Sequence, residues 1–486
     1  MATFQDIGVS SNTTYQGAQL SQSVPSGRGQ IVGVTAKGPL NYEKTIRDIK
    51  DFERVFGGRT PYSKMYDHVR ATLALGTAEL FITRVVGPAA TNGSVTLTDG
   101  ASESPKDVLT VEVIDPGQQS QDYKVNITAR PDMGFDLTVV DTSANRTIAA
   151  FLANESPADL ASRSYDNPMV RIKDLGAGVN PAVGSFAVST GSDDRASITV
   201  DDYVKALDAH KDVPGGVAVA APDLVAPASA EKIGQHAIER EKIYIADLPY
   251  DTTLDEACAI GDTLMGKPNT KNVTVAYPSI RVPDSNQRTR TVGGSAYAMA
   301  ARSVTHTTVS PAQPPAGQAR AMAAPTSPVS KLDLDDINEL NQHGISGIQT
   351  TGGRSYLNNW SSLSTDPAMR ELAHTDAMNQ IAIALRAGAE RLLWRPNEGL
   401  ERIRGEAAGV VDTVLQPYYA AGYLFPDKDV EGNVLNAGYG FTIEDIRASG
   451  QNAPYSELAM TVWVKLSPIV RHVEIGITSV DPMTAI

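Results

Sequence analysis

Residues that could carry out chemistry are present, but none has the spacing of a common catalytic motif. Ser346 follows closely on His343, yet the segment Gly344-Ile345-Ser346-Gly347 lacks the G-x-S-x-G spacing of a nucleophile elbow. A serine and a base that are neighbours in sequence rarely act together, because catalytic triads are assembled across a fold. We therefore interpret Ser346 as a turn residue beside a surface histidine, and we predict no catalytic residue.

Nucleotide- and metal-binding motifs are also missing from the sequence. There is no G-x-x-x-x-G-K-[ST] loop, and after Gly176-Ala177-Gly178 the position of the third glycine of a dinucleotide turn is taken by Pro181. No two histidines have the spacing of an H-E-x-x-H helix; the seven are His68, His210, His236, His306, His343, His374 and His472. The local acidic pairs are Asp201-Asp202, Asp335-Asp336 and Asp247 with Asp251. Asp335-Asp336 opens a predicted helix, whose dipole favours carboxylates there, and we expect no cofactor and no metal.

Composition excludes several further classes of protein. The 486 residues correspond to about three domains. With 42 basic and 56 acidic residues, the net charge of −14 argues against direct binding of nucleic acid. The single Cys258 excludes an internal disulfide framework and a zinc site built from several thiolates, and we interpret it as a small buried thiol on a helix over 253–265. No apolar run approaches 18 residues and the first residues do not resemble a secretory signal, so we expect a soluble protein without membrane insertion.

The pattern of apolar residues predicts an α/β protein with an inserted β domain. Strands near 31–34 and 80–86, with helical spacing between them, indicate a parallel crossover in a covered sheet. From about 90 to 197, short alternating segments separated by turn residues predict a β-sandwich or small barrel. The α/β pattern then returns: we predict strands over 217–220, 243–246 and 273–276 and helices near 201–210, 227–242 and 253–265.

The last third and the two ends of the chain are different. Helices are predicted near 333–342, 366–388 and 397–421, and strands near 457–466 and 470–480. The first residues are rich in Ser, Gln and Gly and are too polar to build a core, so they form either a disordered tail or an arm that is ordered on a partner. Near the other end, Val473, Ile475 and Ile477 alternate with polar residues or glycine, as in a half-buried strand.

Several blocks, taken in order along the chain, resemble one family. They are Val24-Pro25-Ser26-Gly27, Lys37-Gly38-Pro39, Asp51 to Gly58, Leu80 to Val85, Tyr277 to Asp284, Gly293 to Ala298, Leu340 to Ile348, and Trp394 to Glu398 with Leu400 and Arg404. The chain resembles the tail sheath proteins of contractile phage tails and related contractile injection machines. The segment 90–197 matches nothing in the family, as expected of a variable outer domain.

The resemblance implies an α/β (α+β) multi-domain fold with a central subtilisin-like α/β core, an inserted all-β domain and terminal strand arms. The expected parts are an N-terminal arm (1–24), the first part of the core (25–89), an outward-facing insert (90–197), a central α/β domain (198–330), a C-terminal α+β domain (331–469) and a C-terminal strand arm (470–486). The likeness to subtilisin implies fold and not proteolysis, since no triad can be placed.

The resemblance also implies how such a subunit works. Sheath subunits form a homo-oligomer of stacked six-fold rings around an inner tail tube, between a baseplate and a tail terminator, and they contract without ATP. Strands from the arms of different subunits complete a sheet in a third one by β-augmentation. The arm residues expected to do this are Ile7, Val9, Thr13, Tyr15, Val473, Ile475 and Ile477. The expected location is the virion, after assembly in the host bacterial cytoplasm.

The acidic net charge suggests that opposite charges meet at contacts between subunits. The candidates are Arg281, Arg288 and Arg290 on one loop, and Glu398, Glu401 and Glu406 on a helix. A solvated surface is the alternative explanation for these charges.

Other functions remain open from the sequence. One is the sheath of a non-phage contractile injection system. Others are an α/β hydrolase with an unrecognised site, and another virion component such as a capsid or adhesin protein.

Overall fold

The computed structural model describes residues 27–40, 42–284, 286, 288–322, 326–393, 400–445 and 458–471. The chain divides into two compact units, one comprising Pro25–Gln380 and the other Ile381–Ile486 with Met1–Val24. Within the described residues, no helix combines the length and the apolar character needed to span a membrane. The arm residues Ile7, Val9, Thr13, Tyr15, Val473, Ile475 and Ile477 lie outside the described residues.

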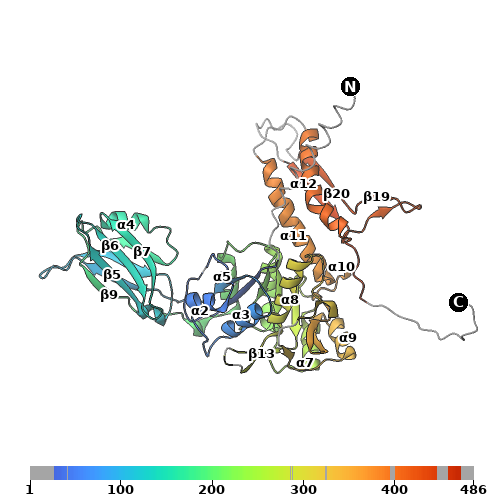
Figure 1. The fold of residues 1–486 in the computed structure, drawn as a ribbon, viewed down its shortest axis with the longest axis horizontal. Coiled ribbons are helices and arrows are strands. Elements are labelled where there is room, and N and C mark those ends of the chain that lie inside the picture. Colours follow the sequence, from blue (N-terminus) through green and yellow to red (C-terminus); the bar gives the residue numbers. More distant parts are fainter. Residues whose placement is uncertain are drawn as a thin grey trace, which may run out of the picture. The chain divides into compact units, whose positions relative to one another are not determined.

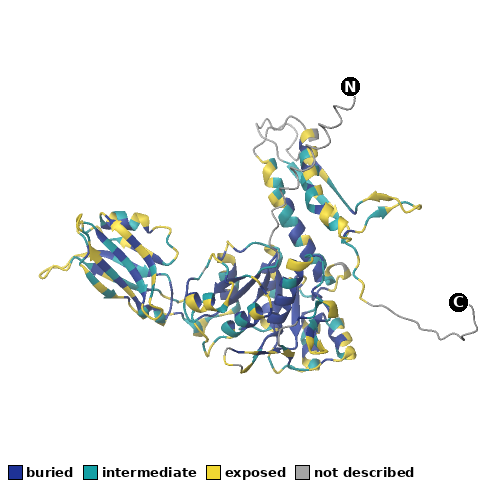
Figure 2. Ribbon diagram, viewed as in Figure 1, coloured by how far each residue is buried: buried dark blue, intermediate teal, exposed yellow. Residues whose placement is uncertain are grey.

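A seven-stranded sheet forms the centre of the larger unit (Figure 1). In spatial order its strands are β17 (Arg354–Leu357), β16 (Ile345–Thr351), β12 (Val273–Tyr277), β11 (Ile243–Ala246), β10 (Ala218–Ala220), β1 (Gly29–Gly33) and β2 (Leu80–Arg84). Only β17 is antiparallel to its neighbour. The middle strands are buried along their whole length, as expected for a parallel sheet covered on both faces (Figure 2).

Helices cover this sheet on both faces. They are α2 (Ile49–Phe56), α3 (Met65–Ala74), α5 (Val200–Ala209), α6 (Ala226–Glu239), α7 (Leu254–Leu264), α8 (Gly294–Thr308) and α9 (Leu334–Gln342). Helices α5, α6, α7 and α9 share one apolar core with the sheet, whereas α3 and α8 contact each other and the strands. Capping boxes at Thr199, Thr253 and Asp333 fix the starts of α5, α7 and α9. The predicted α/β crossovers and their helices are confirmed.

The segment after β2 folds as two sheets around one core. The three-stranded sheet holds β3 (Gly93–Thr98), β4 (Asp107–Val113) and β8 (Val170–Asp174). The four-stranded sheet holds β7 (Arg146–Asn154), β6 (Phe135–Asp141), β5 (Tyr123–Ala129) and β9 (Gly184–Ala187). Inward residues alternate strictly along β6, and residues of both sheets form a single apolar cluster, which is the arrangement of a β-sandwich.

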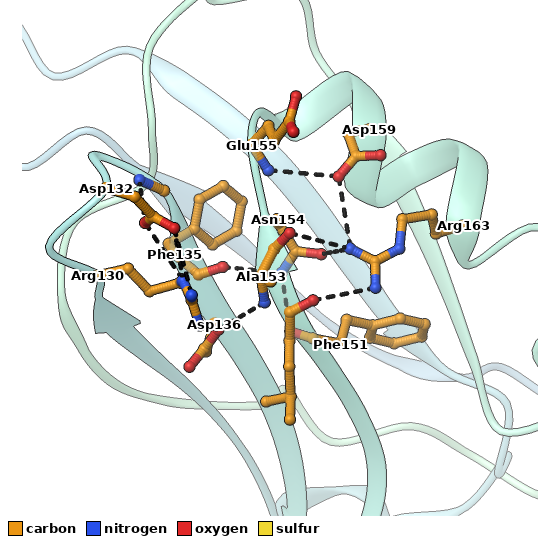
Figure 3. A network of polar contacts seen from close by, with 12 residues as sticks. Arg130, Asp132, Phe135, Asp136, Phe151, Ala153, Asn154, Glu155, Asp159 and Arg163 are labelled. Carbon is orange, nitrogen blue, oxygen red and sulfur yellow. Dashed lines mark hydrogen bonds and ion pairs between the residues drawn. The ribbon is translucent and has the colours of Figure 1, made fainter.

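This sandwich is not purely β, because α4 (Pro157–Arg163) follows β7. Figure 3 shows the hydrogen bonds that hold α4 against the end of β7. The Arg163 guanidinium donates to Asn154 Oδ1 at 3.0 Å and to the Leu152 carbonyl at 3.0 Å. The buried Asn154 amide in turn donates to the carbonyls of Phe135 and Phe151. The all-β expectation overlooked α4, which begins with Ser156 capping the Asp159 amide and Pro157 in the first turn.

Two ion pairs join the sandwich to the core, one from β2 and one from the loop after β1. Arg84, fully buried at the end of β2, donates to Asp115 Oδ1 at 2.6 Å and to the Pro116 carbonyl at 2.6 Å. Asp115 also accepts from the Gly38 amide at 3.0 Å. Lys37 Nζ lies 2.6 Å from the buried Asp141 carboxylate. Arg84, which lies within the second predicted strand, therefore connects the core to the inserted domain.

Smaller elements complete the larger unit. A three-stranded sheet contains β14 (Thr289–Val292), β13 (Ile280–Pro283) and β15 (Ser327–Pro328), and α10 covers Pro367–Arg370. Short 3-10 turns lie at η2 (Gln118–Asp122), η3 (Arg195–Ser197), η4 (Gln318–Arg320) and η5 (Glu390–Leu392), the last in the smaller unit.

Helix α11 (Leu372–Ala389) is continuous across the boundary between the two units. Its first half is anchored in the larger unit, where Arg302 donates to Asp376 Oδ1 at 2.6 and 2.9 Å. Trp360 Nε1 donates to the other carboxylate oxygen of Asp376 at 3.1 Å. Burial acts to raise the pKa of Asp376, but the charges and hydrogen bonds of Arg302 and His306 together outweigh it and the pKa is lowered.

The smaller unit consists of a helical pair and two hairpins. Its elements are the second half of α11, α12 (Leu400–Ala420), β18 (Asp427–Lys428), β19 (Val434–Asn436), β20 (Tyr439–Asp445) and β21 (Leu458–Val464). A Cβ at Gly388 would lie 2.4 Å from Val410, so glycine allows α11 to approach α12 closely. Together these parts confirm the predicted mixed α/β, multi-domain fold.

Candidate strand-acceptor site

The smaller unit contains a two-stranded antiparallel sheet made of β20 and β21 (Figure 1). Its register runs from Tyr439 opposite Val464 to Asp445 opposite Leu458. An isolated two-stranded sheet is marginal in water and needs packing on one face to be stable. Here that packing comes from α11 and α12.

The inner face of this sheet is apolar. It consists of Tyr439, Phe441, Ile443, Leu458, Met460, Val462 and Val464, which pack against the two helices. On the outer face, Trp463 lies over Gly440, where an added Cβ would meet the indole at 2.7 Å. The alternation of side chains fixes the register of both strands, because a slip by one residue would turn the inner face outward.

The inner face is only partly covered. Ile443 is buried, but Phe441, Met460, Val462 and Val464 are half-buried although they pack against the core. Two strands spaced about 4.8 Å apart are narrower than two helices packed about 8–10 Å apart. The two strands alone are therefore too narrow to cover the helical pair.

Both outer edges of the sheet are unpaired within the part of the chain that the structure describes. The Lys465 amide donates to the Gly438 carbonyl at 2.7 Å, so these two residues form a hydrogen-bonded pair. Hydrogen-bonded and non-hydrogen-bonded pairs alternate along two antiparallel strands. The main-chain groups of Phe441 and Ile443 therefore point away from β21, and those of Met460 and Val462 point away from β20. Each edge therefore presents donors and acceptors that a further extended segment could use.

One polar contact holds the start of β20 on α12. The Tyr439 hydroxyl donates to Asp412 Oδ1 at 2.9 Å and lies 3.2 Å from Gln416 Oε1. Burial and the hydrogen bond to Asp412 raise the pKa of Tyr439 to about 12. This tyrosine is thus a neutral donor that fixes the strand, and it has no feature of an acid–base catalyst.

The predicted interface charges lie in different surroundings. Arg281 and Arg288 are exposed, the first on β13. Arg290 is already bonded within its own chain, with Nε 3.1 Å from Asp284 Oδ2. On α12, Glu406 pairs with Arg402 at 3.5 Å and Glu401 belongs to the first turn, whereas Glu398 lies outside the described residues.

A buried cluster at the carboxyl end of the central sheet bears on the hydrolase alternative. Ser295, at the start of α8, donates its hydroxyl to Asp247 Oδ2 at 2.6 Å and its amide to Oδ1 at 2.8 Å. The hydroxyl oxygen then accepts from His68 Nε2, which lies 2.7 Å away.

This order is the reverse of that in a nucleophile triad, in which the serine gives its proton to the histidine. In addition, all three residues are buried. The cluster instead caps the N-terminus of α8, since a Cβ at Gly293 would occupy the place of the Asp247 carboxylate.

The cluster predicts an unusual dependence of stability on pH. Burial lowers the pKa of His68 to about 3, so below about pH 6.5 the unfolded chain binds a proton that the folded chain does not. His68 therefore contributes stability that is lost as pH falls from about 6.5 towards 3. Burial raises the pKa of Asp247 to about 6 although Ser295 acts to lower it, and this contribution has the opposite sign: it is lost as pH rises through about 6.

We expect His68→Gln to remove the part of the loss of stability at acidic pH that is due to His68. The free energy of unfolding of the variant relative to the native chain should rise by about 1.4 kcal/mol per pH unit as pH is lowered from 6.5. Urea unfolding at pH 7, 6, 5 and 4 measures this, with the partly exposed His374→Gln as control. Parallel pH profiles for the native chain and His68→Gln would contradict the assignment.

The sequence predicted only one strand of the β20–β21 sheet. A strand near 457–466 was predicted and is confirmed as β21, but β20 was not predicted. The signal was present, because Tyr439, Phe441 and Ile443 alternate with Gly440, Thr442 and Glu444. The interpretation of Cys258 as a small buried thiol is confirmed: it is buried on α7, and burial raises the pKa of its thiol to about 11.

Comparisons with solved structures agree with the predicted resemblance. A sheath tail protein of Listeria innocua superposes with a TM-score of 0.55 at 13% identity, over 92% of this chain and 97% of that one. The helical sheath of the anti-feeding prophage, in its contracted state, gives a TM-score of 0.51 at 12% identity, over 93% of this chain and 92% of that one. No protein-family profile matches the chain, and no curated protein matches its sequence.

At these identities the likeness establishes the fold. The chain has the fold of contractile tail sheath proteins over more than 90% of its length. The resemblance first found in short blocks of sequence is confirmed at this level.

Proposed function

We propose that this chain is the structural subunit of a contractile sheath, and that it has no enzymatic role. The observation that carries the proposal is the acceptor sheet, with its half-buried apolar face and two edges that no other described segment pairs with. A strand added at each edge would pair with the exposed main-chain groups and cover the remaining apolar surface. The sheath fold of the solved neighbours supports the same function.

The added strands are the two ends of other copies of the chain. Residues 470–486 contain the alternating Val473, Ile475 and Ile477, whose apolar side chains suit the inner face of the acceptor. Residues 1–24 contribute Ile7, Val9 and Tyr15 among polar residues. A chain that gives two strands and receives two makes contacts that need not close, and such contacts generate helical polymers.

The polymer of the proposal has stacked six-fold rings around an inner tail tube and joins a baseplate and a tail terminator. It makes no direct contact with nucleic acid and does not enter the membrane. It belongs to a virion tail assembled in a bacterial cytoplasm; the sheath of a non-phage injection particle is the second candidate.

Contraction in this proposal is a change between two packings of the same polymer. If the contracted packing buries about 200 Å² more apolar surface per subunit, it is favoured by about 5 kcal/mol at ~25 cal/mol per Å². Summed over many subunits, this free energy can move a tube without ATP. The strand connections keep subunits joined while their bodies rotate.

Truncation of the ends tests the proposal. We expect variants lacking residues 1–20, or the segment after residue 469, to remain folded monomers that form no tubes. Negative-stain microscopy and sedimentation measure assembly, and far-ultraviolet circular dichroism measures folding. Normal tubes from either truncated chain would show that its end is not a donated strand.

A further inference from the structure

Helices α7 and α9 bring three metal-ligating side chains together. The Cys258 Sγ, a Glu339 carboxylate oxygen and a His343 ring nitrogen all lie within 4.8 Å of one another. Cys258 is far in the sequence from Glu339 and His343, and no part of the proposed sheath function uses these residues. We propose that this cluster is a binding site for a zinc-like divalent transition-metal ion.

The backbone builds this site from two pairs of residues with i, i+4 spacing. On α7, Cys258 and Asp262 share one face. On α9, the His343 amide donates to the Glu339 carbonyl at 3.3 Å, so the helical turn extends to His343 and the two side chains also share a face. A Cβ at Gly261 would lie 2.4 Å from the His343 carbonyl oxygen, and this glycine lets the end of α9 close against α7.

The histidine is already oriented as a metal ligand would be. His343 Nδ1 lies 2.6 Å from Asp262 Oδ1, so the carboxylate holds this nitrogen and leaves Nε2 as the ligand atom. A carboxylate on the second ring nitrogen is the usual outer partner of a zinc-binding histidine. It fixes the tautomer and the direction of the ring.

The donor set selects the class of ion. Thiolate, imidazole and carboxylate together suit zinc and its neighbours, whereas calcium and magnesium prefer oxygen ligands alone. Two ligands of a tetrahedral zinc ion lie roughly 3.5 Å apart. Since Glu339 is exposed and has a flexible side chain, it can close the remaining distance, and water would fill the fourth position.

Electrostatics and burial favour the ion further. Cys258 is only 5% exposed, and Glu339, Asp262 and Asp255 place negative charge around its sulfur. A divalent cation would compensate this charge. On binding, the Cys258 thiol releases its proton to solvent and the thiolate forms the metal–sulfur bond.

The single cysteine gives the site a clean readout. Because Cys258 is the only cysteine in the chain, a thiolate–metal signal from the full-length protein reports on this position alone. We expect Zn²⁺ to bind with one ion per chain in a calorimetric titration. Co²⁺ should give a thiolate-to-metal charge-transfer band in the near ultraviolet.

Variants separate the site from adventitious binding. Cys258→Ala and His343→Ala should each weaken Zn²⁺ binding at least about 100-fold. Asp262→Asn, which keeps all three ligands, should weaken it about 10- to 100-fold. The control Asp335→Asn removes an exposed carboxylate of α9 outside the cluster and should change nothing.

Circular dichroism checks that each variant is folded, and Asp262→Asn keeps the test valid if the alanine variants are not. Absence of Zn²⁺ binding by the native chain in the calorimetric titration would overturn the proposal. Equal Zn²⁺ affinity in the native chain and in Asp262→Asn, with a Co²⁺ spectrum that lacks the charge-transfer band, would overturn it as well.

Discussion

Replacing Val462 by proline is expected to abolish tube assembly and to leave the monomer folded. The amide of Val462 points to the outer edge of β21, so proline removes a donor that the strand's own ladder does not use. An incoming strand would lose one hydrogen bond and be left with a buried unpaired carbonyl, a combined cost of about 2–4 kcal/mol. The critical concentration for assembly should rise roughly 30- to 1,000-fold.

The matched control for this change is Val462→Ala. Both variants lose the half-buried side chain, but alanine keeps the amide and should assemble at nearly the native concentration. Sedimentation of assembled material at several protein concentrations gives the critical concentration of each variant. Equal assembly by the proline and alanine variants would rule out strand addition at this edge.

Breaking the buried pair of Arg302 and Asp376 is expected to be the most destabilising point change in the larger unit. Both side chains are almost inaccessible, and Asp376→Asn leaves the guanidinium without its counter-charge. Removing one partner of a buried ion pair costs about 3–5 kcal/mol. Because Asp376 lies on α11, the first half of this helix should loosen from the larger unit.

The double variant Arg302→Met with Asp376→Leu distinguishes a charge effect from a packing effect. It removes both charges, so it should be more stable than Asp376→Asn alone, although Trp360 Nε1 loses its acceptor. Urea unfolding followed by circular dichroism measures both. A cost below about 1 kcal/mol for Asp376→Asn would mean that the pair is not buried in solution.

Much of the larger unit could be predicted from the sequence, because its signals are local. The parallel strands are short apolar runs, and helices such as α7 and α9 begin at capping boxes that can be read directly from Thr253 and Asp333. The insert was visible from strict alternation of apolar residues, as in β6. Helix α4 was missed because its signal, Ser156 with Pro157, is short and lies among strands.

The contacts between distant segments could not be predicted. Arg84 was predicted within a strand, but nothing in the sequence names Asp115 as its partner. Likewise, nothing in the sequence names Asp284 as the partner of Arg290, and the place of Arg290 at an interface stays a prediction. The metal-ligand cluster could not be predicted for the same reason, because its two helices are distant in the sequence. Asp262 on the first and His343 at the end of the second are 81 residues apart.

The acceptor sheet was half predicted, and the reason is physical. A strand with one apolar face carries a weaker apolar signal than a strand that is buried on both faces. The sequence therefore indicated β21 but not the hairpin, and only the structure shows β20 beside it with both outer edges open in the described residues.

A density map of the assembled polymer would show directly whether subunits exchange strands. We expect a four-stranded sheet in every subunit, with β20 and β21 in the middle. One edge strand would come from residues 1–24 and the other from residues 470–486 of two other copies. A map in which both termini fold back onto their own subunit, or in which intact tubes leave the edges of β20 and β21 uncovered, would contradict it.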